Sequence, residues 1–183
     1  MAVPVLGFVA MSVDFLSDQE AAAFSRYGGV PSGVELERFF FLDDEDRALV
    51  ARHRGDHNRL GFGVQLTTVR YLGRFLADPL DGVPVEVVDY LAEQLEVADP
   101  SCLKRYAQRA ETHREHVGEI RRALGLRDFA AVAGQLRGWV DKWAWVSGDG
   151  PKAIFAGAVS WLRERGVLLP GVSTLTPTRR LMI

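Results

Sequence analysis

The sequence predicts an all-α protein of several helices, arranged in two lobes with a helix-turn-helix-like element in each. Helix-capping patterns recur along the chain, and the segments between them carry apolar residues at spacings of three and four. No segment shows the strict alternation of apolar and polar residues that is typical of a half-buried strand. The 183 residues are 48% hydrophobic and 25% charged, the composition of an ordinary globular protein that can bury a core.

In the first half of the chain, capping residues and glycines mark where we expect helices to begin and end. Ser17 and Ser32 each stand three residues before a glutamate, which predicts a capping box and a helix start at both. Acids at positions 43–46 favour the start of a helix that ends near Gly55. A long helix then covers residues 55–76, and Pro84 opens a helix that runs to about residue 96.

The second half is expected to contain four more helices. Asp99-Pro100 begins the first, and a capping box at Thr112 begins the second, which stops at Gly125. A Trp-rich helix covers 128–147, and a last helix follows the turn at 148–151 and ends at residue 166. We place the boundary between the lobes near residue 97, giving a lobe of 1–97 and a lobe of 98–183 with an extended C-terminal tail.

The predicted helix over 55–76 is the most informative segment. It is apolar almost all round and must therefore be buried, yet it carries three arginines, Arg59, Arg70 and Arg74. At about 100° per residue these arginines and Gly63 fall on one side of the helix. The arginines need either carboxylates of this protein, for example those of 81–99, or an anionic partner. Gly63 would let a neighbouring helix or a ligand approach closely.

Charge along the chain is segregated. Residues 52–74 hold five arginines and one acid, residues 75–100 hold seven acids and no Lys or Arg, and residues 103–127 hold seven basic residues and three glutamates. The net charge of −2 excludes a global field that would attract nucleic acid, so any such role would rest on the two basic blocks. The polar side of the helix over 112–124 is either a recognition helix or a set of internal ion pairs, and both interpretations stay open.

Signatures of catalysis and metal binding are largely absent. The sequence has no phosphate loop, nucleophile elbow or zinc motif. The acids at 43–46 favour a helix cap over a cation site. His113 and His116 fit packing in a helix better than metal binding, with His113 on the apolar face and His116 at its edge. Trp139, Trp143 and Trp161 favour a core over base stacking. We therefore expect no catalytic residue, no metal and no cofactor.

The single cysteine, Cys102, fits a reducing compartment, and the longest apolar runs are too short to span a membrane. The apolar N-terminus lacks the basic start of a signal peptide. The expected location is therefore the cytoplasm, with no membrane partner.

Several strings resemble, in order and over nearly the whole chain, the N-terminal region of the large transposases of the Tn-three family of replicative bacterial transposons. The most specific are Leu36-Glu37-Arg38-Phe39-Phe40, Asp56-His57-Asn58-Arg59-Leu60-Gly61-Phe62, Arg70-Tyr71-Leu72-Gly73-Arg74-Phe75 and Leu168-Leu169-Pro170-Gly171-Val172. In this family the region is similar to a set of helical domains that bind the terminal inverted repeats of the transposon. The catalytic carboxylates lie in a downstream ribonuclease H-like domain, so the resemblance implies that this chain has none.

The resemblance thus implies a non-catalytic DNA-binding module. The expected partners are double-stranded DNA at transposon ends, the remainder of the transposase and, as a further option, a second copy of the chain in a homodimer. The alternative is a dimerisation or regulatory module without direct DNA contact. The candidate DNA-binding residues are the basic and amide side chains of the two basic blocks: Arg52, Arg54, Asn58, Arg59, Arg70, Arg74, Lys104, Arg105, Arg109, Arg114, Arg121 and Arg122.

Overall fold

The computed structural model describes residues 26–76, 78, 82–108, 110–146, 148 and 150–171, with the side chains of 144–146 left out. These residues form α-helices with short π and 3₁₀ segments, so the all-α prediction is confirmed for them. In chain order the elements are α2 (Gly33–Glu35), η1 (Leu36–Phe40), α3 (Asp44–Val50), α4 (Asp56–Leu72), α5 (Val85–Gln94), η2 (Pro100–Cys102), α6 (Leu103–Ala107), α7 (Ala110–Ala123), η3 (Phe129–Ala131), α8 (Ala133–Val146) and α9 (Pro151–Glu164).

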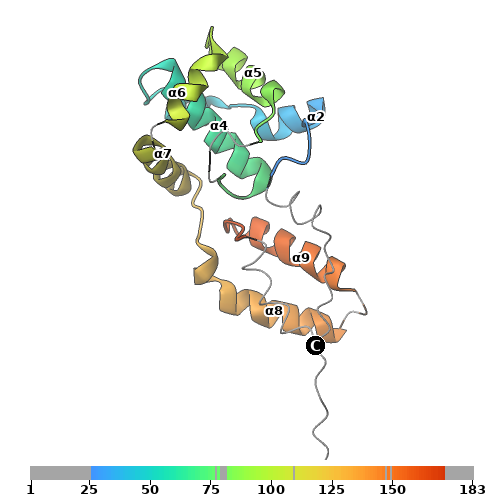
Figure 1. Ribbon diagram of the computed structural model, residues 1–183. Helices are drawn as coiled ribbons and strands as arrows, with labels where there is room; N and C mark the ends of the chain where they lie inside the picture. Colours follow the sequence, from blue (N-terminus) through green and yellow to red (C-terminus); the bar gives the residue numbers. More distant parts are fainter. Residues whose placement is uncertain are drawn as a thin grey trace, which may run out of the picture.

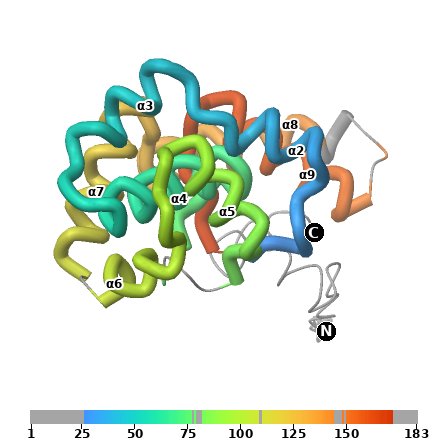
Figure 2. The backbone as a smooth tube through the Cα atoms, turned by 90° about the horizontal axis from the view of Figure 1, so that it is seen from above, coloured from blue at the N-terminus to red at the C-terminus, as the bar shows by residue number. Residues whose placement is uncertain are grey.

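Helix α4 lies at the centre of a first body made of α2 to α7 (Figures 1 and 2). Every residue of α4 from Leu60 to Val69 is buried, as its apolar sequence predicts. Its large side chains pack in one hydrophobic cluster with residues of η1, α5, α6 and α7. Burying each leucine or phenylalanine of this kind contributes about 1.5–3 kcal/mol to the free energy of folding. Packing around α4 is therefore a main source of stability in the first body.

The closest helix approach in this body is made by a glycine and a tyrosine. A Cβ placed on Gly61 of α4 would overlap the ring of Tyr106 from α6, so only glycine fits there. Tyr106 is fully buried. At Gly63, for which we expected a close approach, the neighbour is instead Cδ1 of Leu95, 3.3 Å from the position of a Cβ.

A second body contains α8 and α9, which lie side by side (Figure 1). Its hydrophobic cluster includes Val140, Leu162 and Trp161, with Trp139 packed against it. The Trp143 ring crosses α9 at Gly157, where a Cβ would overlap the ring. The tryptophans therefore serve as core residues, as their helical spacing predicts.

The two hydrophobic clusters do not divide at residue 97, and the two lobes placed there stay a prediction. Leu103, Tyr106 and Ile120 of α6 and α7 belong to the cluster around α4, and the second cluster contains Val132 and later residues. The division by packing therefore lies between Leu126 and Phe129. The sequence break near 97 marks only the end of α5, because α6 returns to α4 through the contact at Gly61.

The two bodies meet at the C-terminal end of α4. Gly73 ends α4 in the left-handed conformation, with φ +76°, and a Cβ there would lie 2.8 Å from Cδ1 of Leu169. The backbone N–H of Leu169 donates to the Gly73 carbonyl at 2.8 Å. One isolated bridge joins Arg127 to Val167. The segment after α9 thus ties the second body to the first.

Several helix ends differ from expectation. Ser32 forms the predicted capping box, and a second box joins Asp43 to Asp46. Thr112 does not begin a helix, because α7 starts at Ala110. Helix α4 ends at Leu72 rather than near 76, since Gly73 provides the cap. The helix predicted from Ser17 lies outside the described residues, and within the described ranges no helix has the length and apolarity to cross a membrane.

Replacing Gly61 by alanine should destabilise the protein by about 1–3 kcal/mol, because the added methyl group forces Tyr106 out of its site. Urea denaturation followed by circular dichroism measures the change. The matched control is Gly118→Ala in α7, where nothing lies within 4 Å of an added Cβ. That control should keep or raise stability, because alanine favours a helix over glycine by about 1 kcal/mol. Equal loss of stability in both variants would contradict the packing described.

Candidate nucleic-acid interface

The loop between α3 and α4 exposes two of the predicted arginines. The Arg52 side chain is 65% exposed and lies 3.7 Å from the Glu119 carboxylate of α7. Arg54 is exposed, and its guanidinium forms no ion pair within the described part of the chain. Both therefore precede α4 closely, Arg54 without a described ion pair and Arg52 beside the Glu119 carboxylate.

Helix α6 adds two further cations at the same end of α4. Lys104 and Arg105 are exposed, while Leu103 and Tyr106 of the same helix are buried against α4. Arg105 and Asp56, the first residue of α4, both act electrostatically on Cys102, so α6 lies beside the start of α4. Neither cation forms an ion pair with the residues that the structure describes.

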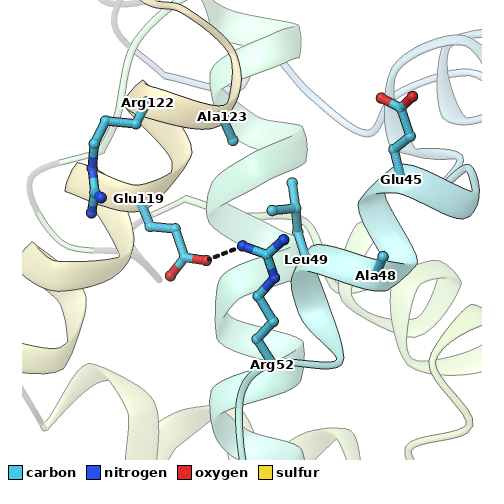
Figure 3. A pocket seen from close by; sticks show the side chains of 7 residues that line it. All are labelled: Glu45, Ala48, Leu49, Arg52, Glu119, Arg122 and Ala123. Atoms are coloured by element: carbon cyan, nitrogen blue, oxygen red, sulfur yellow. Dashed lines mark ion pairs between the residues drawn. The ribbon is translucent and has the colours of Figure 1, made fainter.

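Helix α7 contributes Arg114 and Arg122, which are exposed and lie along one stripe with Gly118 between them. Glu119 approaches Arg52, and Arg122 lines the same groove against α3 (Figure 3). Nε of Arg122 donates to the Gly118 carbonyl at 3.1 Å, which leaves its other N–H groups available. We call the exposed cations of the α3–α4 loop, α6 and α7 the basic face: Arg52, Arg54, Lys104, Arg105, Arg114 and Arg122.

Three other predicted residues are engaged by the protein itself. Arg59 donates to the backbone carbonyl of Leu95 and lies 3.5 Å from Asp56. The Asn58 amide donates to the Arg54 carbonyl at 2.9 Å and so caps the end of the loop. Arg121 pairs with Asp128 at 2.5 Å, just beyond the end of α7.

Arg70 is partly buried and pairs with α3, so it does not belong to the basic face. Both of its terminal nitrogens donate to the two carboxylate oxygens of Asp46, which is 2% exposed. The partner is therefore Asp46 of the capping box and not an acid of 81–99. Arg74 is half-buried near the end of α4, and Arg109 lies outside the described residues. We leave these three out of the basic face.

The loop and helices that carry the basic face pack together through a cluster of aromatic and imidazole rings. The rings of His53 and His116 lie 4.2 Å apart, and Phe62 of α4 contacts both. Nδ1 of His116 is 3.1 Å from the Tyr106 hydroxyl, and Nε2 of His53 is 3.6 Å from Glu119. His116 is the buried histidine, with 4% exposed, whereas we expected His113 to be the more buried of the pair.

Burial depresses the pKa of the three clustered histidines. It lowers the pKa of His116 to about 4, and the neighbouring His53 and His113 act in the same direction. Burial also lowers the pKa of His53 against the opposing effect of Glu119, with Arg52 adding to the decrease. The pKa of His113 is lowered for the same main reason, with Asp78 opposing and Arg114 assisting. The cluster therefore packs in its neutral form at pH 7.

Within the described ranges, no three His, Cys, Asp or Glu side chains come together as metal ligands would.

Two important arginines were not singled out from the sequence. Arg47 donates to the carbonyls of Leu42 and Gln94, and Arg163 donates to carbonyls at the end of α4. The bond from Arg47 to Gln94 joins residues 47 positions apart, and those from Arg163 join residues 91 and 92 positions apart. Local spacing carries no signal of such pairs.

A protein-family model described as a domain of unknown function, DUF4158, matches residues 15–178. The chain is also similar to bacterial transposases. It is 40% identical over 167 residues to the transposase for transposon gamma-delta of Escherichia coli (strain K12). It is 34% identical over 149 residues to that of Tn501 from Pseudomonas aeruginosa, and 30% identical over 169 residues to that of Tn1546 from Enterococcus faecium.

These matches cover 90%, 77% and 91% of this chain but only 17%, 14% and 16% of the three relatives. The resemblance to Tn-three-family transposases is thus confirmed as homology over most of the chain. The chain spans less than a fifth of each relative, so the activity of a whole transposase is not carried over by similarity alone.

Replacing Arg70 by glutamine should destabilise the fold by about 3 kcal/mol, because it leaves the Asp46 carboxylate buried without its cationic partner. Urea denaturation checks this. The double variant Arg70→Gln/Asp46→Asn should be more stable than the sum of the two single effects predicts, since the unpaired buried charge is gone. Unchanged stability in Arg70→Gln would show that the pair contributes little to the fold.

Acidification should destabilise the protein through the histidine cluster. The folded pKa of His116, about 4, is below its unfolded value of 6.5, so its contribution is present above pH 6.5 and is lost as pH falls toward 4. Between pH 7.5 and pH 5 we expect His116 to account for a loss of about 2 kcal/mol. In His116→Gln, denaturation at the two pH values should show a smaller loss. An equally large loss in that variant would assign the pH dependence elsewhere.

Proposed function

Because the chain belongs to the DUF4158 family and is homologous to transposases, we propose that it is a non-catalytic DNA-binding module of a transposase that recognises the terminal inverted repeats of its transposon. The observation that carries this proposal is the basic face. It gathers six exposed cations from three neighbouring elements: the α3–α4 loop, α6 and α7. Helices α6 and α7 pack on α4 and on each other, and Arg52 of the loop lies beside Glu119 of α7. Arginine predominates among them, and its planar fork binds phosphate and guanine in a bidentate manner.

Different residues of the basic face suit different contacts, some with phosphates and others with bases. Arg52 and Arg54 lie on a loop, and Lys104 and Arg105 on a helix too short to enter a groove deeply, so these residues suit contacts with phosphates. Helix α7 carries Arg114 and Arg122 on one exposed stripe and is the candidate for base contacts in the major groove. Helices α6 and α7, separated by Gln108 and Arg109, form the helix-turn-helix-like pair in this proposal.

The rest of the transposase would then be the protein partner, and would supply the catalytic residues that this chain is proposed to lack. Because bacterial DNA is in the cytoplasm, a module that binds it is proposed to be cytoplasmic. Homodimerisation belongs to the second candidate below and is not required for DNA binding by one chain.

The second candidate is an interaction module that holds transposase chains together without touching DNA. It is favoured by apolar side chains left exposed on the first body: Val34 is 75% exposed, Val85 is 63% exposed and Phe41 is 54% exposed. Sedimentation of the chain alone tests it, because a concentration-dependent dimer that is lost in Phe41→Ser and binds no DNA would favour this candidate over the first.

The chain should bind a duplex that carries the inverted repeat more tightly than a scrambled duplex of the same length, as measured by fluorescence anisotropy. Affinity should fall with salt concentration, with a slope of about 0.9 for each phosphate contact. Arg54→Gln should lower affinity for both duplexes and reduce that slope by about 0.9. Arg122→Gln should reduce the preference for the inverted repeat as well, by about 1–3 kcal/mol if it contacts a base.

The charge-matched control is Arg137→Gln, an exposed arginine of α8 outside the basic face. It should leave both the affinity and the salt slope unchanged. Failure of the wild-type chain to bind either duplex at low salt would overturn the proposal, as would equal losses in the control and in Arg54→Gln.

A further inference from the structure

A second concentration of arginines lies where the two bodies meet. A groove of about 450 Å³ is walled by the end of α4, the segment after α7 and the end of α9. Its charged lining consists of Arg38, Arg70 and Arg163, and none of the described residues that line it is acidic. Apolar side chains such as Leu124 and Leu126 form the remainder, with Gly73 keeping one wall free of a side chain.

Arg163 holds this groove in shape. It extends from α9 and donates to the carbonyls of Tyr71 and Leu72 at 3.2 and 3.1 Å, which are among the carbonyls that the end of α4 leaves without helical partners. A cation in this position is stabilised by the dipole of α4. Only one terminal nitrogen makes these bonds, and Arg163 is among the residues that line the groove. Burial of part of its side chain lowers the pKa of Arg163, although the residue as a whole is exposed.

The other two arginines differ in the charge that they offer. Arg38 is exposed, its guanidinium carbon lies 5.1 Å from the centre of the Phe39 ring, and no described carboxylate pairs with it. Arg70 also lines the groove, but its charge is neutralised by Asp46. The groove therefore carries the positive charge of Arg38 and Arg163 without a compensating acid in its walls.

We propose that this groove binds a phosphate group of a nucleic-acid backbone. Guanidinium forks match phosphate oxygens in bidentate geometry, and apolar walls strengthen the attraction by lowering the local dielectric. The identity of the polymer rests on the proposed function. The groove lies near the basic face along the chain, because Arg122 of the basic face is followed directly by the segment with Leu124 and Leu126, which line this groove. In this proposal a duplex held by the first body is also contacted where the second body, α8 and α9 in Figure 1, joins it.

The first experiment tests the phosphate site without relying on DNA binding. Side-chain Nε–H signals of arginine are followed by NMR in the full chain, and the variants Arg38→Gln and Arg163→Lys assign the two signals. Both signals should shift saturably with inorganic phosphate and not with chloride at the same ionic strength. They should shift again with the inverted-repeat duplex. Signals that respond to neither phosphate nor DNA would overturn the proposal.

The second experiment measures DNA affinity and its salt slope for Arg38→Gln, with Arg54→Gln and Arg137→Gln beside it. Arg38→Gln should weaken binding several-fold and reduce the slope by about 0.9, while its thermal unfolding stays like that of the wild type. Weaker binding in Arg54→Gln with no change in Arg38→Gln would overturn the groove and leave the proposed function standing.

The remaining outcomes separate the sources of the anion. Phosphate could shift the two signals while the wild-type chain binds no DNA. That result would overturn both the proposed function and the nucleic acid as ligand of the groove, and would leave a site for free phosphate. If a polyglutamate peptide shifts them where phosphate and DNA do not, the occupant is an acidic protein segment and the proposal is overturned.

Discussion

The structure depends on burying α4 on all of its sides. Ten consecutive residues, from Leu60 to Val69, have almost no contact with water, which is unusual for a helix that carries arginines. The close contact at Gly61 fixes α6 against α4, and α7 follows from α6 through Tyr106 and His116. The end of α4 at Gly73 then receives the second body. Each proposed binding surface is therefore positioned relative to one rigid helix.

Sequence patterns predicted the helices well wherever a local interaction defines them. The Ser32 box, the turn at Asp99 and the left-handed Gly125 with φ +60° all depend on residues within a few positions of one another. The division of the chain into bodies was not predictable in this way. It follows from α6 and α7 returning to α4, and that depends on a glycine meeting a tyrosine 45 positions later, for which a single sequence carries no signal.

At the candidate site too, the sequence indicated which residue needs a partner but not which residue provides it. The helical spacing correctly indicated that Arg70 needs a carboxylate or an anion, but the acids of 81–99 were the wrong source. Asp46 was interpreted as a surface cap, although its position four residues after Leu42 and four before Val50, both buried, places it on the apolar side of α3. That spacing was a usable signal. The exposure of Arg52, Arg54 and Lys104 followed more simply, because no apolar periodicity includes them.

The segregation of charge explains how a chain with a net charge of −2 can present a basic surface. The acids of α5, Glu86, Asp89 and Glu93, are exposed, and α5 packs on α4 with η1 and η2 rather than with α7. The cations of α6 and α7 extend from other sides of α4, and in Figure 1 α5 and α7 lie on opposite sides of that helix. A polyanion would be repelled from the α5 side and attracted to the α7 side, so this asymmetry can orient the encounter even though the total charge cannot promote it. The groove between the two bodies is a second cationic surface with no acidic residue among its described lining, so the same electrostatic argument applies to it.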